Sequence, residues 1–185
     1  YNTALLEGYQ KQLLGIPIGL PMKDGDANIY SFCSSLNTST IGEKTGAVLM
    51  SAAEVWLLRA EAALRGYTKE NPRTCYEYGV RTSFTQWDCA GASEYLESDK
   101  TPADYKDVVS GGKVGKDMKA LITISPKWEE DADIETKLEK IITQKWLAGW
   151  PESYEAWAEQ RRTGHPNLFK VQNNTGHETD TTTLN

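Results

Sequence analysis

The stretch SAAEVWLLRAEAALRG, residues 51–66, constrains what this chain can fold into more than any other part of the sequence. Ser51 and Glu54 have the S-x-x-E spacing of a capping box, in which two residues satisfy backbone N–H groups at a helix start. Gly66 follows the apolar run and suits the left-handed position that ends many helices. Alanine and leucine, which favour helices, fill most of the positions between. The stretch therefore predicts a helix with a defined start and end.

A second helix is predicted over residues 71–87, after a short turn. Asn71 is a good N-cap, and Pro72 suits the first helical position because no N–H donor is needed there. Three apolar residues recur at steps of four and so share one face: Tyr76, Val80 and Phe84. A helix rich in small residues, a turn and a helix with an aromatic face form a tetratricopeptide-like hairpin.

A second helical hairpin is predicted over residues 131–166. The residues that bound its two helices are, in order, Asp133, Gly149, Pro151, Gly164 and Pro166. One face of its second helix carries Tyr154, Trp157, Ala158 and Arg161. We expect Trp146 and Trp157 to pack within this hairpin.

The chain is therefore predicted to be one all-α domain, with tetratricopeptide-like hairpins and long irregular loops. No long segment has the alternating pattern of a strand. The parts of residues 1–185 are, in order, a loop-rich lead-in (1–46), the first hairpin (47–87), an irregular insertion (88–130), the second hairpin (131–166) and a polar tail (167–185). Short helices are also expected at residues 2–12 and from a start at residues 101–104.

Charge and hydropathy argue against two classes of function. The formal net charge is −6 and no dense block of Lys and Arg is present, whereas nucleic-acid binding needs a basic surface. No apolar run approaches the length of a membrane-spanning helix.

Patterns for catalysis and metal binding are weak. The cysteines lack metal-site spacing and are expected to be buried or free thiols: Cys33, Cys75 and Cys89. The segment DGDAN, residues 24–28, begins like a calcium loop but lacks its distal glutamate.

Three carboxylates could act on a glycosidic bond, but the dipole of a helix also favours carboxylates near its start: Glu152, Glu155 and Glu159. His165 and His177 lie in no nucleophile or zinc motif. We predict a protein that is not an enzyme and holds no metal or cofactor.

Arg161 and Arg162 lie at the end of the last predicted helix, where the helix dipole favours cations. A guanidinium there can stack on Trp157, or grip a buried carboxylate such as Glu61 or Glu54. Anion binding is the functional alternative, and the structural role is the preferred interpretation.

Two long blocks resemble the SusD/RagB-like outer-membrane lipoproteins of Bacteroidetes-type bacteria. They are LMSAAEVWLLRAEAALRG (49–66) and IITQKWLAGWPESYEAWAEQRRTGHPNL (141–168), within a similarity that covers roughly residues 45–170. Matching residues in the first block are Ala53, Glu54, Leu57, Leu58, Ala60, Glu61, Ala62 and Gly66. Those in the second are Gln144, Lys145, Trp146, Glu155, Ala156, Trp157, Glu159, Arg161, Arg162, Thr163, Gly164 and Pro166. The resemblance implies that these motif residues form a helical scaffold, above all Glu54, Glu61, Trp146, Trp157, Arg161, Arg162 and Gly164.

The resemblance also implies a function. Such proteins bind a nutrient, usually an oligosaccharide or other glycan, at the bacterial cell surface and deliver it to a TonB-dependent, SusC-like transporter. They are held at the outer membrane by a lipid anchor and are longer, so this chain is expected to be a middle-to-late portion of one. Two alternatives stay open: a helical-repeat domain that binds another protein, and an α-helical glycoside hydrolase.

The resemblance implies that ligand binding falls to variable loops rather than to the motif blocks. Sugar rings stack their C–H groups on Trp and Tyr, and nearby polar side chains bind their hydroxyls. The aromatic candidates for ligand binding are Trp87, Tyr95, Tyr105 and Trp128. The candidates for polar contacts are Asp88, Glu94 and Asp99.

Overall fold

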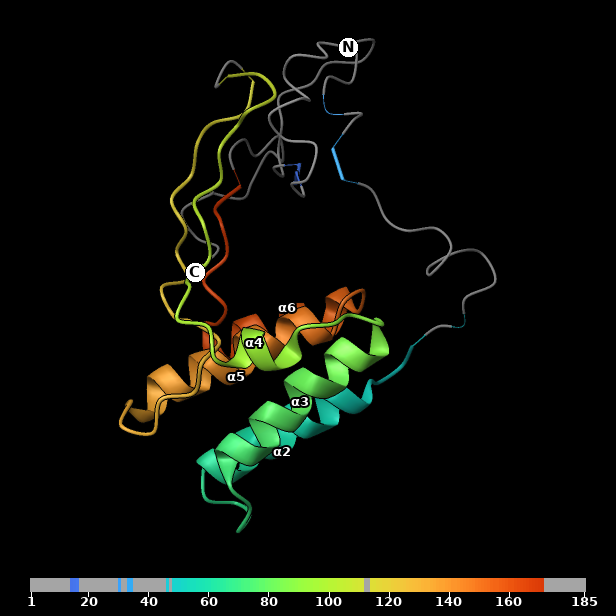
Figure 1. Ribbon diagram of the computed structural model, residues 1–185, viewed down its shortest axis with the longest axis vertical. Coiled ribbons are helices and arrows are strands. Elements are labelled where there is room, and N and C mark those ends of the chain that lie inside the picture. Colours follow the sequence, from blue (N-terminus) through green and yellow to red (C-terminus); the bar gives the residue numbers. More distant parts are fainter. Residues whose placement is uncertain are drawn as a thin grey trace. The chain divides into compact units, whose positions relative to one another are not determined.

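The computed structural model describes residues 14–16, 30, 33–34, 46, 48–111 and 114–171. Within these residues the fold is all-α, as predicted, with the isolated antiparallel bridge Tyr105–Met118 as its single β pairing (Figure 1). None of the helices in this part of the chain is long and apolar enough to cross a membrane. The helix expected at residues 2–12 and the turn at 24–28 lie outside the described residues.

The chain forms two compact units. The first contains residues 47–102 and 121–168, and we call it the helical unit because the described helices lie in it. The helices are α2 (Ala52–Leu64), α3 (Pro72–Gln86), α4 (Ala92–Leu96), α5 (Ile134–Ala148) and α6 (Ser153–Thr163). The second unit contains residues 1–46, 103–120 and 169–185. The organisation of residues 1–185 as one domain stays a prediction.

The first hairpin, α2 and α3, is bounded by the predicted caps. The Ser51 side chain accepts a hydrogen bond from the backbone N–H of Glu54 at 3.0 Å. Gly66 follows α2 at a φ of 75°, in the left-handed region that glycine adopts at least cost. Asn71 accepts from the backbone N–H of Thr74 at 2.9 Å. Local chemistry therefore defines both helices, which lie side by side in Figure 1.

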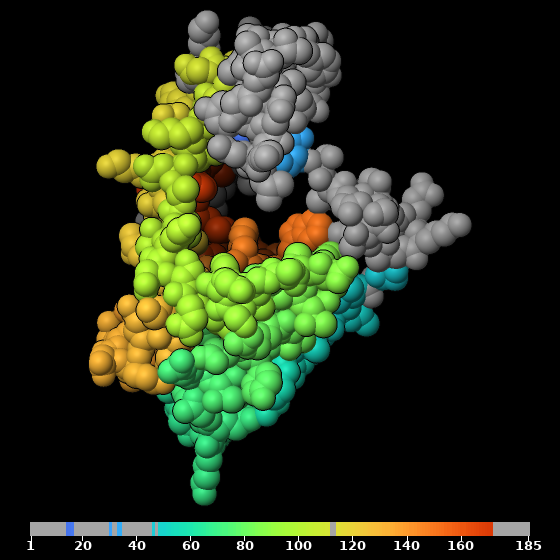
Figure 2. Space-filling model, in the orientation of Figure 1, coloured from blue at the N-terminus to red at the C-terminus, as the bar shows by residue number. Residues whose placement is uncertain are grey.

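Close approach of the two helices requires a glycine in the middle of α3. A Cβ added at Gly79 would lie 2.6 Å from Leu57 Cγ and 3.4 Å from the carbonyl oxygen of Ala53. Leu57 and Ala53 are fully buried on α2. In Figure 2 the spheres of α2 and α3 are in continuous contact. Gly79 thus lowers the intrinsic stability of α3 but allows α2 and α3 to pack closely.

We expect Gly79→Ala to lower the free energy of unfolding by about 1–2 kcal/mol. Overpacking costs about 1–3 kcal/mol, and the higher helix propensity of alanine returns about 1 kcal/mol at most. Urea unfolding followed by circular dichroism measures the change. Gln86→Ala, at the exposed end of the same helix, is the control and should change little. A Gly79→Ala variant as stable as the parent would contradict the close packing.

The second hairpin, α5 and α6, confirms the predicted helices with two corrections. The second helix begins at Ser153 rather than Pro151, because the chain first turns and the Glu152 N–H donates to the carbonyl of Gly149 at 2.7 Å. Trp157 does not pack within the hairpin, since it is 62% exposed. The face of α6 that carries it lies outward, and charged side chains form the inward face instead.

The helix predicted to start at residues 101–104 is absent. The chain has no regular secondary structure there, and the backbones of Tyr105 and Met118 exchange hydrogen bonds of 2.8 and 3.0 Å. The Asp104 carboxylate accepts from the N–H of Ala120 at 2.9 Å, so it joins two chain segments rather than capping a helix. The short helix α4 was not predicted, because its N-cap, Gly91, offers no side-chain signal.

The core of the helical unit lies where α2, α3 and α5 meet. Leu57, Tyr76 and Ile141, one from each helix, are fully buried. The Tyr76 hydroxyl donates to the carbonyl of Pro126 at 2.6 Å, which fixes the irregular stretch before α5 against the helices. Burial of these apolar side chains is the main stabilising contribution here.

Candidate functional site

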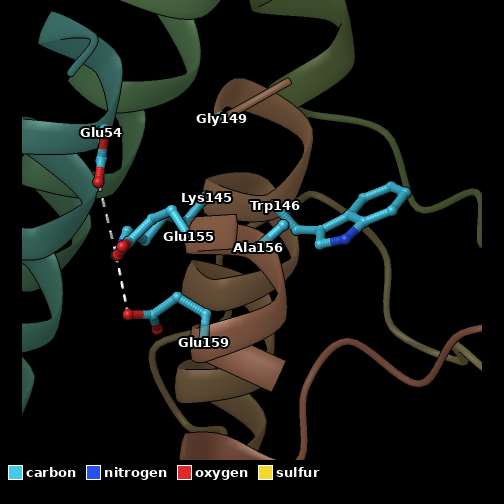
Figure 3. Close-up of a pocket in the computed structure, with 7 residues that line it drawn as sticks. All are labelled: Glu54, Lys145, Trp146, Gly149, Glu155, Ala156 and Glu159. Atoms are coloured by element: carbon cyan, nitrogen blue, oxygen red, sulfur yellow. Dashed lines mark hydrogen bonds and ion pairs between the residues drawn. The ribbon is translucent and has the colours of Figure 1, made fainter. Parts of the chain in front are cut away.

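Lys145 on α5 is buried, with 3% of its side chain exposed. Its Nζ atom lies 2.9 Å from a carboxylate oxygen of Glu155 and 2.9 Å from one of Glu159, both on α6. A carboxylate oxygen of Glu54 on α2 is 3.8 Å away. Figure 3 shows the ammonium between Glu54 and Glu159. A buried lysine needs such partners, and here one ammonium connects three helices.

Arg162 extends these contacts along α6. Its two terminal nitrogens donate to the two carboxylate oxygens of Glu61, each at 2.7 Å, and one also donates to Glu159 at 2.6 Å. Arg65 donates to Glu61 at 2.7 Å. Glu61 is thus the buried carboxylate that Arg162 binds, through the two-pronged geometry of strong charge-assisted hydrogen bonds. We call the connected set the ion cluster: Glu54, Glu61, Arg65, Lys145, Glu155, Glu159 and Arg162.

Neighbouring charges decide how the ion cluster titrates. Burial alone would raise the pKa of the Glu61 carboxyl, but hydrogen bonds from its two arginine partners bring it below the ordinary value. Burial would lower the pKa of the Lys145 ammonium, but hydrogen bonds to its two carboxylate partners on α6 raise it. Glu54 differs, because burial raises its pKa and the nearby ammonium offsets this only in part. Glu61 and Lys145 therefore carry favourable charges at neutral pH.

A small cavity borders the ion cluster, and Figure 3 shows its lining: Glu54, Lys145, Trp146, Gly149, Glu155, Ala156 and Glu159. It has room for about one water molecule, much less than a sugar ring requires. The Trp146 ring points away from the carboxylates. No group of three or more potential metal ligands occurs in the described part of the chain. The ion cluster joins helices and offers no space for a substrate.

Arg161 lies on the outer face of α6. Its guanidinium carbon is 5.0 Å from the centroid of the Trp157 ring, a cation–π distance. The two neighbouring arginines therefore differ, since Arg162 pairs with buried carboxylates and Arg161 covers an exposed tryptophan. Gly164, at a φ of 77°, ends the helix directly after them.

Two of the predicted ligand-binding rings contribute to the core. Trp128 is only 7% exposed, and its ring centroid lies 5.2 Å from that of Tyr76. Tyr95 packs on Phe84 at 5.4 Å, and its hydroxyl accepts a 2.9 Å hydrogen bond from the Gln144 amide. Trp128 therefore holds an irregular segment, and Tyr95 the short helix α4, against the longer helices.

Two further candidates also have structural partners. Tyr105 belongs to the second compact unit, where its backbone pairs with Met118. Asp99 forms a 3.2 Å salt bridge with Lys127 at the surface.

At the end of α3, the candidate Trp87 contacts one residue that the sequence did not indicate, and the last two candidates follow shortly after it in the chain. The ring of half-buried Trp87 lies 5.4 Å from that of Trp150, at an interplanar angle of 54°. Trp150 is 42% exposed. Asp88 and Glu94 are exposed, and within the described residues neither forms a salt bridge. Trp150 could have been suspected from its place in a turn, between Gly149 and Pro151.

Comparison with known proteins gives a consistent result. The family model described as "SusD-like: Susd and RagB outer membrane lipoprotein" matches residues 1–185. No match was found among curated proteins. Among solved structures, a SusD homolog from Bacteroides vulgatus ATCC 8482 is 53% identical with a TM-score of 0.83, over 92% of this chain and 34% of that one.

Two other solved structures show the same similarity over less of the chain. A SusD homolog from Bacteroides uniformis ATCC 8492 is 44% identical, with a TM-score of 0.65, over 71% of this chain and 27% of its own. A chitin-binding SusD homolog from Flavobacterium johnsoniae is 41% identical, with a TM-score of 0.62, over 69% of this chain and 26% of its own. This chain thus spans about one third or less of the solved structures that it matches.

Proposed function

This chain belongs to the SusD-like family, and from that premise we propose that it binds a nutrient glycan at the bacterial cell surface without cleaving it. The observation that carries the proposal is the family match over the whole of residues 1–185. The chitin-binding relative supports a glycan as the class of ligand.

Delivery to a SusC-like, TonB-dependent transporter is the second part of the proposal. In this role the protein is held at the outer membrane by a lipid anchor and presents the glycan to its partner. The description of the matching family as outer-membrane lipoproteins supports this location. Because the chain spans only part of its solved relatives, the partner and the anchor are proposed for the whole protein.

Binding without catalysis agrees with how the carboxylates are used. A glycoside hydrolase needs two carboxyl groups that face one glycosidic bond. Glu155 and Glu159 instead accept hydrogen bonds from Lys145, beside a cavity with no room for a sugar. This arrangement favours the binding role over the glycosidase alternative.

We expect titration calorimetry to detect binding of at least one oligosaccharide from a panel of chitohexaose, cellohexaose, maltohexaose, xylohexaose and mannohexaose. Chromatography of the same mixtures after prolonged incubation should show intact sugar, because Glu155 and Glu159 are paired with Lys145 instead of facing a substrate. Heat-unfolded protein is the control. Absence of binding to every member would contradict glycan capture, and shortened sugar would contradict the non-catalytic role.

A helical-repeat domain that binds another protein is the second candidate, favoured by the outer face of α6. Tyr154 is 87% exposed and lies one turn before the exposed Trp157. Aromatic residues on such a face are typical anchors at protein interfaces. Co-purification with the SusC-like transporter, but with no sugar of the panel bound, would favour this role.

A further inference from the structure

Two other tryptophans of the helical unit already have a stacking or cation–π partner on the ring. Trp56 stacks on Tyr78 with centroids 4.9 Å apart, and the guanidinium of Arg59 lies 3.9 Å from the centroid of the Trp56 ring. The Trp56 ring therefore already has two ring contacts within the helical unit. Trp157 has Arg161 over it. On each of these rings, the side that the partner covers is not available for a ligand.

The pair of Trp87 and Trp150 differs from both. Its interplanar angle of 54° means that the two rings meet at a tilt rather than covering each other. Trp150 remains 42% exposed, and no cation–π contact to either ring occurs among the described residues. The partners come from separate segments, because Trp87 ends α3 and Trp150 lies in the turn between α5 and α6. Packed helices on both sides therefore fix the pair, and a fixed ring loses little entropy when a ligand stacks on it.

Two carboxylates follow Trp87 closely along the chain. Asp88 follows Trp87 directly, and Glu94 lies on the first turn of α4. Both are exposed and free of salt bridges within the described part of the chain. They can accept hydrogen bonds from sugar hydroxyls, whereas a ligand carboxylate or sulfate would be repelled.

The backbone at Asp88 is unusual. Its φ of 51° makes it the one non-glycine residue in the left-handed region among those described. The Asp88 and Cys89 N–H groups donate to the carbonyls of Thr85 and Phe84, which is the helix ending that glycine normally supplies. A carboxylate held at a glycine-preferring position suggests that the side chain has a use.

We infer that Trp87 and Trp150 form a stacking subsite for a neutral pyranose ring, with Asp88 and Glu94 as its polar residues, an inference that rests on the proposed glycan-binding function. The pyranose places its C–H face on the tryptophan pair, and its hydroxyls donate to the carboxylates. The ligand class is neutral oligosaccharides, as opposed to uronic-acid or sulfated glycans.

Calorimetric titration of the chain tests this subsite with the neutral hexasaccharide of the panel that binds best. Trp150→Ala and Trp87→Ala should each weaken binding about tenfold, the effect of losing one aromatic contact, and Trp150→Phe should recover part of it. Trp157→Ala removes an exposed tryptophan outside the pair and is the matched control, expected to bind as the parent does. Hexagalacturonate should bind at least tenfold more weakly than the neutral sugar.

Asp88→Gly separates a binding role from a structural one. Glycine fits the left-handed position better, so this variant should raise the thermal midpoint while weakening sugar binding. Parental binding in both tryptophan variants, unchanged binding in Asp88→Gly, or preference for hexagalacturonate would overturn the subsite and leave glycan capture standing. Failure of the parent chain to bind any sugar of the panel would overturn the proposed function, and this inference with it.

Discussion

Replacing Lys145 by methionine is expected to lower the free energy of unfolding by about 3–5 kcal/mol, the cost of removing one partner from a buried ion pair. Methionine keeps the length and apolar character of the lysine stem, so the change isolates the charge. Glu54 would lose its nearest cation, while Glu159 would keep only Arg162. Urea unfolding at neutral pH, followed by circular dichroism, measures the loss.

Lys127→Met is the matched control for this prediction. Lys127 makes its salt bridge with Asp99 at the surface, where ion pairs contribute less than about 1 kcal/mol. Adding Glu54→Gln to the Lys145→Met variant should recover part of the stability, because the carboxylate that lost its nearest cation is replaced by a neutral amide. Equal losses in Lys145→Met and Lys127→Met would mean that the ion cluster does not hold the helices together.

Glu61→Gln is expected to cost about 2–3 kcal/mol at neutral pH, since charge-assisted hydrogen bonds to two arginines are lost. Glu54→Gln, the same substitution on the same helix, should instead raise stability. Burial disfavours the ionised form of Glu54 and raises its pKa, so a neutral amide suits its site better. The opposite signs test the electrostatics of the ion cluster without a change of side-chain size.

The pH dependence of the two variants follows from the same pKa directions. The contribution of Glu61 is present above its ordinary pKa of 4.5 and is lost as the pH falls through the lower folded value. Protonated Glu54 contributes stability below 4.5, and this is lost as the pH rises through its raised folded pKa. Both variants should therefore approach the stability of the parent in acid. A Glu61→Gln deficit that persists well below the folded pKa would point to lost packing rather than lost charge.

Local signals account for the helices that the sequence predicted correctly. Ser51, Gly66, Asn71 and Asp133 act within a few residues of themselves, so their effect can be read without knowing the fold. The helix predicted to start at Thr101 was wrong for the opposite reason. Backbone pairing of Tyr105 with Met118, and the hydrogen bond from Ala120 to Asp104, override the local N-cap and proline signal there.

Local sequence signals did not predict which face of α6 lies inward. Apolar periodicity favoured the side with Tyr154 and Trp157, but the helix turns Glu159 and Arg162 inward. Charged residues are expected at the surface unless they are paired, and the pairing depends on residues about a hundred positions away. The resemblance of the motif blocks implied a scaffold role for these residues, while their contacts required the structure.

The sequence predicted one part of the proposed stacking subsite but not its second tryptophan. Trp87 is the last residue of a predicted helix, Asp88 and Glu94 follow it closely, and their residue types suit sugar binding. Trp150 comes from a segment 63 positions further along the chain, and only tertiary packing brings its ring to 5.4 Å from Trp87.

The sequence separation within the ion cluster also has a kinetic consequence. Arg162 and Glu61 are 101 positions apart, so their contact forms only after a long loop has closed. The α2–α3 hairpin needs only a short turn and can form earlier. Contacts that form after the folding transition state affect mainly the unfolding rate. The ion cluster is therefore expected to prolong the lifetime of the folded helical unit, with little influence on how fast the unit folds.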